Sequence, residues 1–259
     1  MATHEPGNSE NARVNHRSNW FYGWTVVAVC TVTMTLGYGV RHSFAVFFTP
    51  ILDQFGWSRG STAIMLSLHL LVYGAVAPFT GALSDRWRPK RMILLGAGIT
   101  ALATAACGLA SELWHFYIIF GVVTPIGLAL IGAPVINPTI TNWFYKFRGI
   151  AFSLAQMGGG LSFLFAIYAE TMISAFGWRM AYFVLGLTLL VILVPLFLRF
   201  YVYHPREKNL EPLGIKDGKL AKEDAATGEV EQGGWTLKQA SRTYQLWLLV
   251  LSQTLFWGV

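Results

Sequence analysis

The chain reads Gly81-Ala82-Leu83-Ser84-Asp85-Arg86-Trp87-Arg88-Pro89-Lys90-Arg91 between two long apolar runs, residues 60–83 and 92–110. This stretch packs four cations and one carboxylate into a few residues. Two apolar runs of that length joined by so short a link must lie as antiparallel neighbours, so the basic turn stays at one membrane face. The positive-inside tendency predicts that this face is cytoplasmic.

The composition also indicates a polytopic membrane protein. Of the 259 residues, 54% are hydrophobic and 12% are charged, whereas soluble domains carry about 25% charged residues. The net charge of +6 follows from the basic turns and does not indicate a nucleic-acid partner. Cys30 and Cys107 lie inside apolar runs without metal-ligand spacing, so we expect no disulfide framework, metal site or cofactor.

Six apolar runs reach the roughly 20 residues that a membrane helix needs. They are residues 22–48, 60–83, 92–110, 113–137, 150–174 and 180–203. Six crossings return the chain to its starting side, which makes residues 1–20 a cytosolic tail. The links agree, with 8 Lys and Arg residues on the predicted inside and 2, Arg59 and Arg179, outside.

The chain changes character after the sixth run. Residues 204–243 carry equal numbers of acidic and basic side chains and few apolar ones, which predicts a mobile cytosolic linker. Residues 244–259 are apolar again and stop within a spanning run. Because a chain end inside the bilayer would leave backbone groups unpaired, we expect this run to be a truncated seventh helix of a longer protein.

The basic turn resembles the signature loop between the second and third helices of the major facilitator superfamily, Gly-x-Leu-x-Asp-Arg-x-Gly-(Pro)-Arg/Lys-Arg. Arg88 stands where that family usually has glycine. The residues that match are Gly81, Leu83, Asp85, Arg86, Pro89, Lys90 and Arg91. The resemblance implies a conformational latch on the cytoplasmic side, to which we assign Gly81, Asp85, Arg86, Arg91 and Arg148.

Two other segments resemble the monocarboxylate-transporter and oxalate/formate-antiporter branch of that superfamily. Residues 143–158 are similar to its pattern aromatic-Phe-x-x-x-Arg-x-x-Ala-x-Gly-x-Ala-x-x-Gly, with Ser153 replacing one glycine. Residues 38–48 are similar to aromatic-x-x-x-cation-Ser-x-x-Val-Phe-Phe. The branch's cation falls on His42, and Arg41 lies one place earlier.

These resemblances imply an all-α fold, the N-terminal six-helix half of a twelve-helix transporter. They also imply secondary transport of a small organic anion by alternating access, coupled to protons or to exchange. The expected partners are the anion, the lipid bilayer and the missing C-terminal six-helix half. The expected location is the inner or plasma membrane, with the N-terminus in the cytoplasm.

Charged residues inside spans are costly unless they face a cavity or a partner, so they are candidates for function. Arg41 and His42 come late in the first run, which predicts that they lie in its outer half and draw an anion from outside. Alternatively, Arg41 reaches the outer headgroups and His42 is a neutral histidine bonded to a neighbouring helix.

Other polar groups complete the predicted site. We assign Tyr38, Asn137 and Gln156, with Arg41 and His42, to substrate binding. His42 and Glu170 are candidates for proton coupling, because the unperturbed pKa of imidazole is about 6.5; a packing carboxylate is the alternative for Glu170. His69, alone on an apolar run, fits a hydrogen-bonded packing residue.

Three further observations bear on the fold and on the rival functions. Residues 55–59, Phe-Gly-Trp-Ser-Arg, are echoed by residues 176–179, Phe-Gly-Trp-Arg, each before an inward-running helix. Pro125, Pro134 and Pro138 predict an irregular fourth helix. No nucleophile–base pair or phosphate loop indicates an enzyme. The alternatives are a carrier of neutral solutes or drugs, and a half-length membrane protein without transport.

Overall fold

The structure is a computed structural model that describes residues 21–87, 89–213 and 241–257. It divides into two units, Met1–Gly214 and Ile215–Val259, and each is described by itself. The helical elements of the first unit are α1 (Tyr22–Phe55), α2 (Arg59–Arg86), α3 (Pro89–Cys107), α4 (Leu113–Ile118), a π-helical turn η1 (Ile119–Val123), α5 (Thr124–Ile131), α6 (Ala133–Trp143), α7 (Arg148–Phe200) and a 3₁₀ turn η2 (Pro205–Lys208). In the second unit the described helix is α10 (Tyr244–Trp257).

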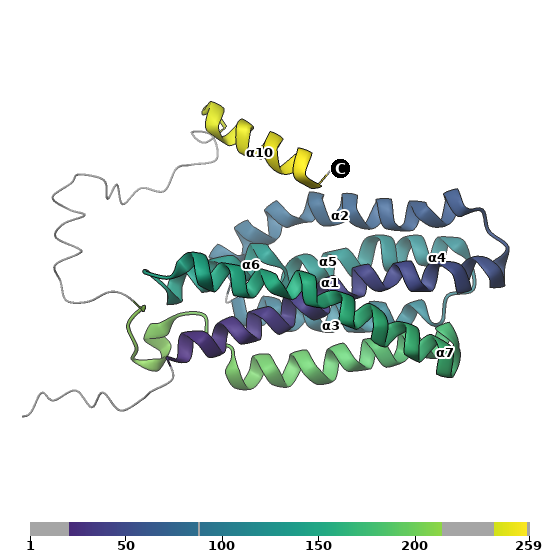
Figure 1. The fold of residues 1–259 in the computed structure, drawn as a ribbon, viewed down its shortest axis with the longest axis horizontal. Helices are drawn as coiled ribbons and strands as arrows, with labels where there is room; N and C mark the ends of the chain where they lie inside the picture. Colours follow the sequence, from purple (N-terminus) through teal and green to yellow (C-terminus); the bar gives the residue numbers. More distant parts are fainter. Residues whose placement is uncertain (1–20, 88, 214–240, 258–259) are drawn as a thin grey trace, which may run out of the picture. The chain divides into compact units, whose positions relative to one another are not determined.

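The described helices of the first unit make six segments, which lie side by side as a bundle (Figure 1). Helix α7 contributes two of them, because its backbone leaves the helical region at Gly177, with φ 77° and ψ 160°, and the chain reverses there. Elements α4, η1, α5 and α6 together make one irregular segment from Leu113 to Trp143. The predicted all-α six-helix half is confirmed.

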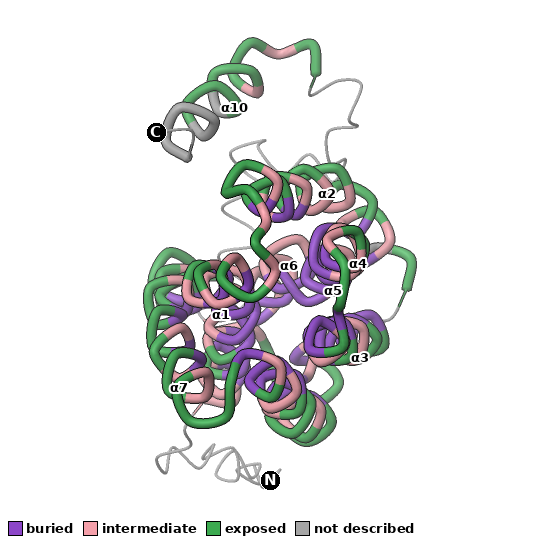
Figure 2. Tube along the Cα trace, turned by 90° about the vertical axis from the view of Figure 1, so that its right-hand side faces the viewer, coloured by how far each residue is buried: buried purple, intermediate pink, exposed green. Residues whose placement is uncertain are grey.

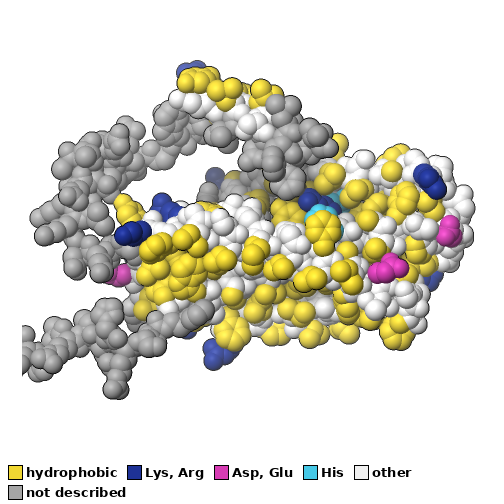
Figure 3. All heavy atoms as spheres, in the orientation of Figure 1, with side chains coloured by type: hydrophobic (Ala, Val, Ile, Leu, Met, Phe, Trp, Pro, Cys, Tyr) yellow, Lys and Arg dark blue, Asp and Glu magenta, His cyan; other side chains and the backbone are white. Residues whose placement is uncertain are grey.

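Five stretches of the described chain are long and apolar enough to cross a membrane. They are Tyr22–Phe55, Arg59–Ser84, Pro89–Cys107, Leu113–Trp143 and Arg148–Phe200, the last with its two arms. Their buried sides face one another and their exposed sides face outward (Figure 2). Large apolar side chains remain uncovered on the outside, among them Phe79, which is 75% exposed. Hydrophobic side chains cover much of the visible flank, as expected of a lipid-facing surface (Figure 3).

The helices are longer or shifted relative to the apolar runs. Helix α1 continues past residue 48 to Phe55, carrying the exposed Asp53 and Gln54, and ends where Gly56 takes a left-handed conformation. The fourth segment continues past residue 137 to Trp143. Hydropathy identifies the apolar part of a helix that can lie in the hydrocarbon core of the bilayer, whereas the helix itself ends at its C-terminal cap.

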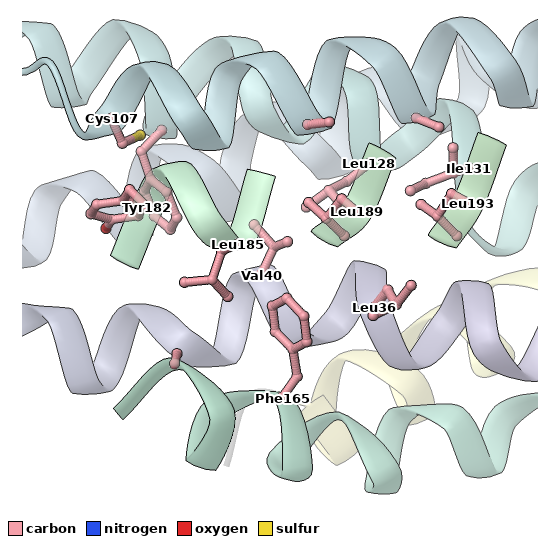
Figure 4. Packing of buried hydrophobic residues seen from close by; sticks show 14 of the residues in the cluster. Leu36, Val40, Cys107, Leu128, Ile131, Phe165, Tyr182, Leu185, Leu189 and Leu193 are labelled. Carbon is pink, nitrogen blue, oxygen red and sulfur yellow. The ribbon is translucent and has the colours of Figure 1, made fainter. Parts of the chain in front are cut away.

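The core lies between α1, α3, α5 and both arms of α7. Figure 4 shows Leu36 and Val40 of α1 beside Phe165, with Leu128 facing Leu189 and Ile131 facing Leu193. Helices α1 and α7 approach closely at Gly158, where an added Cβ would meet the Thr31 carbonyl and lie 2.8 Å from the Cβ of Met34. Such glycine contacts let backbones pack tightly within a membrane.

The two echoed turns meet at one end of the bundle. Phe55 stacks on Trp57 with ring centroids 4.3 Å apart, and Trp178 lies edge-on to Phe55 at 6.0 Å. The Trp178 indole N–H donates to the Gln54 side chain. The echo therefore marks two turns that pack on each other, with left-handed glycines at Gly56 and Gly177.

Part of the predicted linker is folded against the other end of the bundle. The Trp143 indole donates to the Val202 carbonyl at 2.9 Å, and the Leu213 N–H donates to the Trp143 carbonyl at 2.9 Å. The Tyr22 hydroxyl donates to the Phe200 carbonyl at 2.8 Å. Val202 and Phe200 belong to the sixth predicted run, so the bond that reaches the predicted linker is that of Leu213 with Trp143.

Candidate functional site: a pocket at the middle of the bundle

A pocket opens between α1, α2 and the α5–α6 junction, with about 350 Å³ of empty space that includes open solvent at its mouth. Its polar lining combines one cation, one imidazole and two phenols with a threonine hydroxyl. The lining residues are Thr33, Met34, Gly37, Tyr38, Arg41, His69, Tyr73, Leu128, Ile131 and Gly132.

The pocket lies near the middle of the helices that form it. Tyr38 is at the centre of α1, which runs from residue 22 to residue 55. Arg41 follows it by three residues, so at 1.5 Å per residue it lies about 4 Å from the helix midpoint. Arg41 is thus slightly beyond the midpoint of α1 toward Phe55, the end predicted to lie outside, and its place in the outer half stays a prediction.

Arg41 presents a charge without an acidic partner. Its guanidinium carbon is 4.9 Å from the centre of the Tyr38 ring, a cation–π distance, and the residue is half-buried. Among the residues that the structure describes, no carboxylate pairs with this guanidinium. A planar donor set that is held in place but unpaired is suited to bind a carboxylate in a bidentate manner.

The fourth segment breaks beside the pocket, as its prolines predicted. Gly132 is extended, with φ −86° and ψ −167°, and separates α5 from α6. Pro134 and Pro138 have no N–H, so carbonyls four residues earlier lack their usual donor. Gly132, at the break, lines the pocket, and a Cβ added there would lie 2.8 Å from the Tyr73 hydroxyl.

A second interruption in this segment explains the position of His69. In the turn η1 the Thr124 N–H bonds to the Ile119 carbonyl, one residue earlier than in an α-helix, and Pro125 offers no N–H. The Phe120 carbonyl therefore loses its usual backbone donors. His69 of α2, which is fully buried, takes their place, with its Nδ1 2.9 Å from the Phe120 oxygen.

His42 faces a different neighbour from Arg41. Its Nδ1 is 2.7 Å from the Ser162 hydroxyl of α7, and its ring stacks on Phe163 at 5.0 Å. His42 does not line the pocket, but its ring stacks with that of Tyr38, which does, at 6.1 Å between ring centres. Figure 3 shows basic and histidine side chains together on a mostly hydrophobic flank, away from both ends of the bundle.

The other predicted site residues do not line this pocket. Asn137 is half-buried in α6, and Gln156 is exposed in α7. Glu170 is also exposed and follows Ser162 by eight residues, about 12 Å along the helix. The structure therefore groups Tyr38 with Arg41 and places these three side chains elsewhere.

The predicted latch residues lie at the end of the bundle that contains residues 81–91. Gly81 faces Pro134 of α6, with an added Cβ 3.9 Å from that ring. Arg86 and Arg91 are exposed, whereas the Asp85 side chain and Arg88 lie outside the described residues. Arg148 donates from Nε to the Phe144 carbonyl at 2.7 Å and lies over the Tyr145 ring.

His69 and Tyr73 were not among the predicted site residues, although both line the pocket. His69 fitted a packing histidine, and its hydrogen bond to Phe120 agrees with that role in part. A usable signal was their spacing, since residues i and i+4 share one face of a helix, and both are polar in an apolar run. In the described part of the chain, no three His, Cys, Asp or Glu residues gather as a metal site would require.

The chain resembles known transport proteins along most of its length. The family model described as Major Facilitator Superfamily matches residues 27–259. Human monocarboxylate transporter 11 is 31% identical over 201 residues, which cover 75% of this chain and 42% of the relative. The uncharacterized MFS-type transporter YcxA of Bacillus subtilis is 27% identical over 202 residues, covering 77% and 48%.

A solved structure shows the same fold. A bacterial homolog of the human lysosomal transporter Spinster, in an inward-facing and unoccupied conformation, matches with a TM-score of 0.63 and 20% identity. The match covers 81% of this chain and 50% of that one. The chain thus spans about half the length, or less, of the relatives it matches.

Proposed function

The chain belongs to the Major Facilitator Superfamily, and we propose that it forms the N-terminal half of a secondary active transporter for a small organic anion. It is a multi-pass membrane protein, and the relatives it matches are transporters rather than enzymes. The names of several relatives specify monocarboxylates, which supports an anion as cargo. The remainder of the transport path would come from a second six-helix half.

The observation that carries this proposal is the Arg41 guanidinium, half-buried at the middle of the bundle and unpaired by any described carboxylate. An unpaired charge at that depth costs several kcal/mol unless a cavity or a partner relieves it. A substrate carboxylate would supply that partner. Tyr38 supports the geometry, because its ring holds the guanidinium from one side.

Transport would follow from alternating access around this pocket. In such transporters two halves rock about a site near the bilayer midplane, so that the site opens to each side in turn. The position of the pocket along α1 and the broken segment beside it are consistent with such a site. Asn137 and Gln156 would join it only after helices move, since neither lines the pocket here.

Coupling is proposed to use protons or exchange, with His42 as the leading proton carrier. His42 is within hydrogen-bond distance of Ser162, a group that can donate or accept as the imidazole changes its charge. Glu170 is the second candidate. It would act separately from the pocket, because about 12 Å of helix separates it from Ser162.

The basic turn is proposed to latch the cytoplasmic side when the pocket faces outward. Gly81 lies against Pro134 of α6, and Arg86 and Arg91 give the turn an exposed positive charge, to which Arg148 would add. Asp85 would accept hydrogen bonds from a helix N-terminus. This orientation places the turn and the N-terminus in the cytoplasm, at the plasma or inner membrane.

The test is uptake by proteoliposomes that contain the protein as its gene encodes it. Labelled mono- and dicarboxylates are presented at two external pH values, with Arg41→Gln as the test variant and Arg59→Gln, an exposed arginine at the start of α2, as control. We expect uptake of at least one anion that Arg41→Gln reduces at least tenfold and Arg59→Gln does not. Transport that survives Arg41→Ala and His42→Ala together would favour a neutral cargo instead.

A further inference from the structure

We propose that Nε2 of His69 is a hydrogen-bond acceptor that makes the pocket select anions bearing a donor group next to the carboxylate. Such a substrate is a 2-hydroxy acid rather than a 2-oxo acid or an unsubstituted acid. This inference rests on the proposed function, since it assumes that Arg41 holds the carboxylate.

The first step is the tautomer of His69. A carbonyl oxygen can only accept, so the 2.9 Å contact with Phe120 requires a proton on Nδ1. The carbonyl is available because the turn η1 and Pro125 deprive it of backbone donors. The neutral ring then has a bare lone pair on Nε2. Phe120 and Pro125, which follow His69 by 51 and 56 residues, thus determine which ring nitrogen of His69 carries the proton.

The second step is that this lone pair is unused. Nε2 is buried and has no hydrogen-bond partner among the described residues. A buried acceptor left unpaired costs about 1–3 kcal/mol. His69 is one of the residues that line the pocket, so the group assigned to relieve this cost is a ligand that reaches Nε2 from the pocket. A carboxylate oxygen cannot, because it too is an acceptor.

The third step is the charge pattern of the pocket. Arg41 offers only donors, and Nε2 offers only an acceptor, while the Tyr38 and Tyr73 hydroxyls can do either. A substrate that satisfies both fixed groups must carry an anion for Arg41 and an O–H or N–H for His69. A hydroxyl on the carbon next to the carboxylate meets this requirement within one small molecule.

The probes differ at one carbon atom. We would measure uptake of labelled 2-hydroxybutyrate (both enantiomers), 2-oxobutyrate and butyrate by the reconstituted protein. These acids share a carboxylate and four carbons, and among them only the hydroxy acid has a donor at C2. For one neutral hydrogen bond that is otherwise left unmade, we expect an apparent affinity about tenfold higher for one hydroxy enantiomer than for the oxo acid.

Two variants assign the preference to His69. His69→Asn keeps a donor at the level of Nδ1 for the Phe120 carbonyl but has no group in the place of Nε2, so the preference should vanish while butyrate uptake persists. Thr104→Val is the control, because Thr104 is likewise buried and unpaired but lies outside the pocket lining. It should retain the preference. His69→Leu is a second test variant should His69→Asn not fold.

Each outcome bears on one proposal or the other. Equal affinity for the three acids in the wild-type protein, or a hydroxy preference that survives in His69→Asn and His69→Leu, would overturn the role of His69 while leaving the anion site intact. Failure of all three acids to enter, while another carboxylate is taken up, would overturn this inference alone. Failure of every mono- and dicarboxylate, or uptake that is indifferent to Arg41→Gln, would overturn the proposed function itself, and this inference with it.

Discussion

Gly158→Ala is expected to destabilise the bundle by forcing α1 and α7 apart. A Cβ at this position would meet the Thr31 carbonyl and lie 2.8 Å from the Met34 Cβ and 3.0 Å from the Thr35 nitrogen. Ordinary contact starts at 3.4 Å, and the obstructing atoms belong to the backbone or lie next to it. The helices must therefore separate by about half an ångström or more. Overpacking of this kind costs about 1–3 kcal/mol.

Gly160→Ala is a matched control in the same glycine run. No atom lies within 4 Å of a Cβ built at Gly160. The substitution therefore adds only the helix preference of alanine over glycine, up to about 1 kcal/mol in favour of folding. Thermal unfolding in detergent, followed by tryptophan fluorescence, compares the two. At about 2–4 °C per kcal/mol for a chain of this size, Gly158→Ala should melt about 2–12 °C below wild type and Gly160→Ala at or above it.

The same substitution has a functional consequence. Ser162 lies one turn after Gly158 and holds His42 at 2.7 Å, so separation of the helices should lengthen that contact. Proton-dependent uptake should then weaken in Gly158→Ala and persist in Gly160→Ala. Equal melting temperatures for the two variants would refute the reasoning, because they would mean that α1 and α7 are not in backbone contact at this glycine.

Three other predictions concern the turn, the histidine and the sidedness. Gly177→Ala should destabilise by about 1–3 kcal/mol in thermal unfolding, although nothing obstructs its Cβ, because the backbone has φ 77°; an unchanged melting point would contradict this. Pro125→Ala restores a backbone N–H near the Phe120 carbonyl, so the ¹⁵N spectrum of His69 should show its proton shared between Nδ1 and Nε2, and an unaltered spectrum would count against the account of η1. With Cys30 and Cys107 replaced, an impermeant maleimide should label Arg59→Cys in intact cells and Arg91→Cys only after permeabilisation; the reverse pattern would invert the orientation.

The architecture could be predicted because it depends on quantities that the sequence displays directly. Apolar runs of membrane length and a basic turn, residues 81–91, determine how many helices there are and which are neighbours. The repeated Phe-Gly-Trp sequence likewise indicated two similar turns, because Gly56 and Gly177 both have the positive φ that glycine adopts most easily. Pro125, Pro134 and Pro138 indicated the irregular fourth segment because proline has no N–H to donate to the helix.

The site was harder to predict because it depends on which helix faces which. Arg41 and His42 are adjacent in sequence but about 100° apart around α1, so one lines the pocket and the other meets α7. Hydropathy also did not show how near Arg41 lies to the midpoint of α1, since it does not report where a helix ends. The contact of His69 with Phe120 joins two segments whose pairing no local pattern specifies.

The Phe120 carbonyl, which lacks backbone donors, and the His69 imidazole, which lies in an apolar helix, satisfy each other's hydrogen-bonding needs in part. Their pairing leaves Nε2 of His69 as an unpaired acceptor. A carbonyl deprived of donors by a proline and a histidine inside an apolar helix are each unfavourable in a membrane, where no water can satisfy them. Joined, Phe120 and His69 satisfy one another through Nδ1 and leave a single unpaired lone pair at Nε2. Because the second ring nitrogen cannot be satisfied by the same carbonyl, the packing arrangement itself leaves an unpaired acceptor on a residue that lines the pocket together with Arg41. Stability and recognition therefore depend on the same side chain, so removing the imidazole should weaken both the α2–η1 contact and the choice of substrate, whereas removing Nε2 alone should affect only the choice.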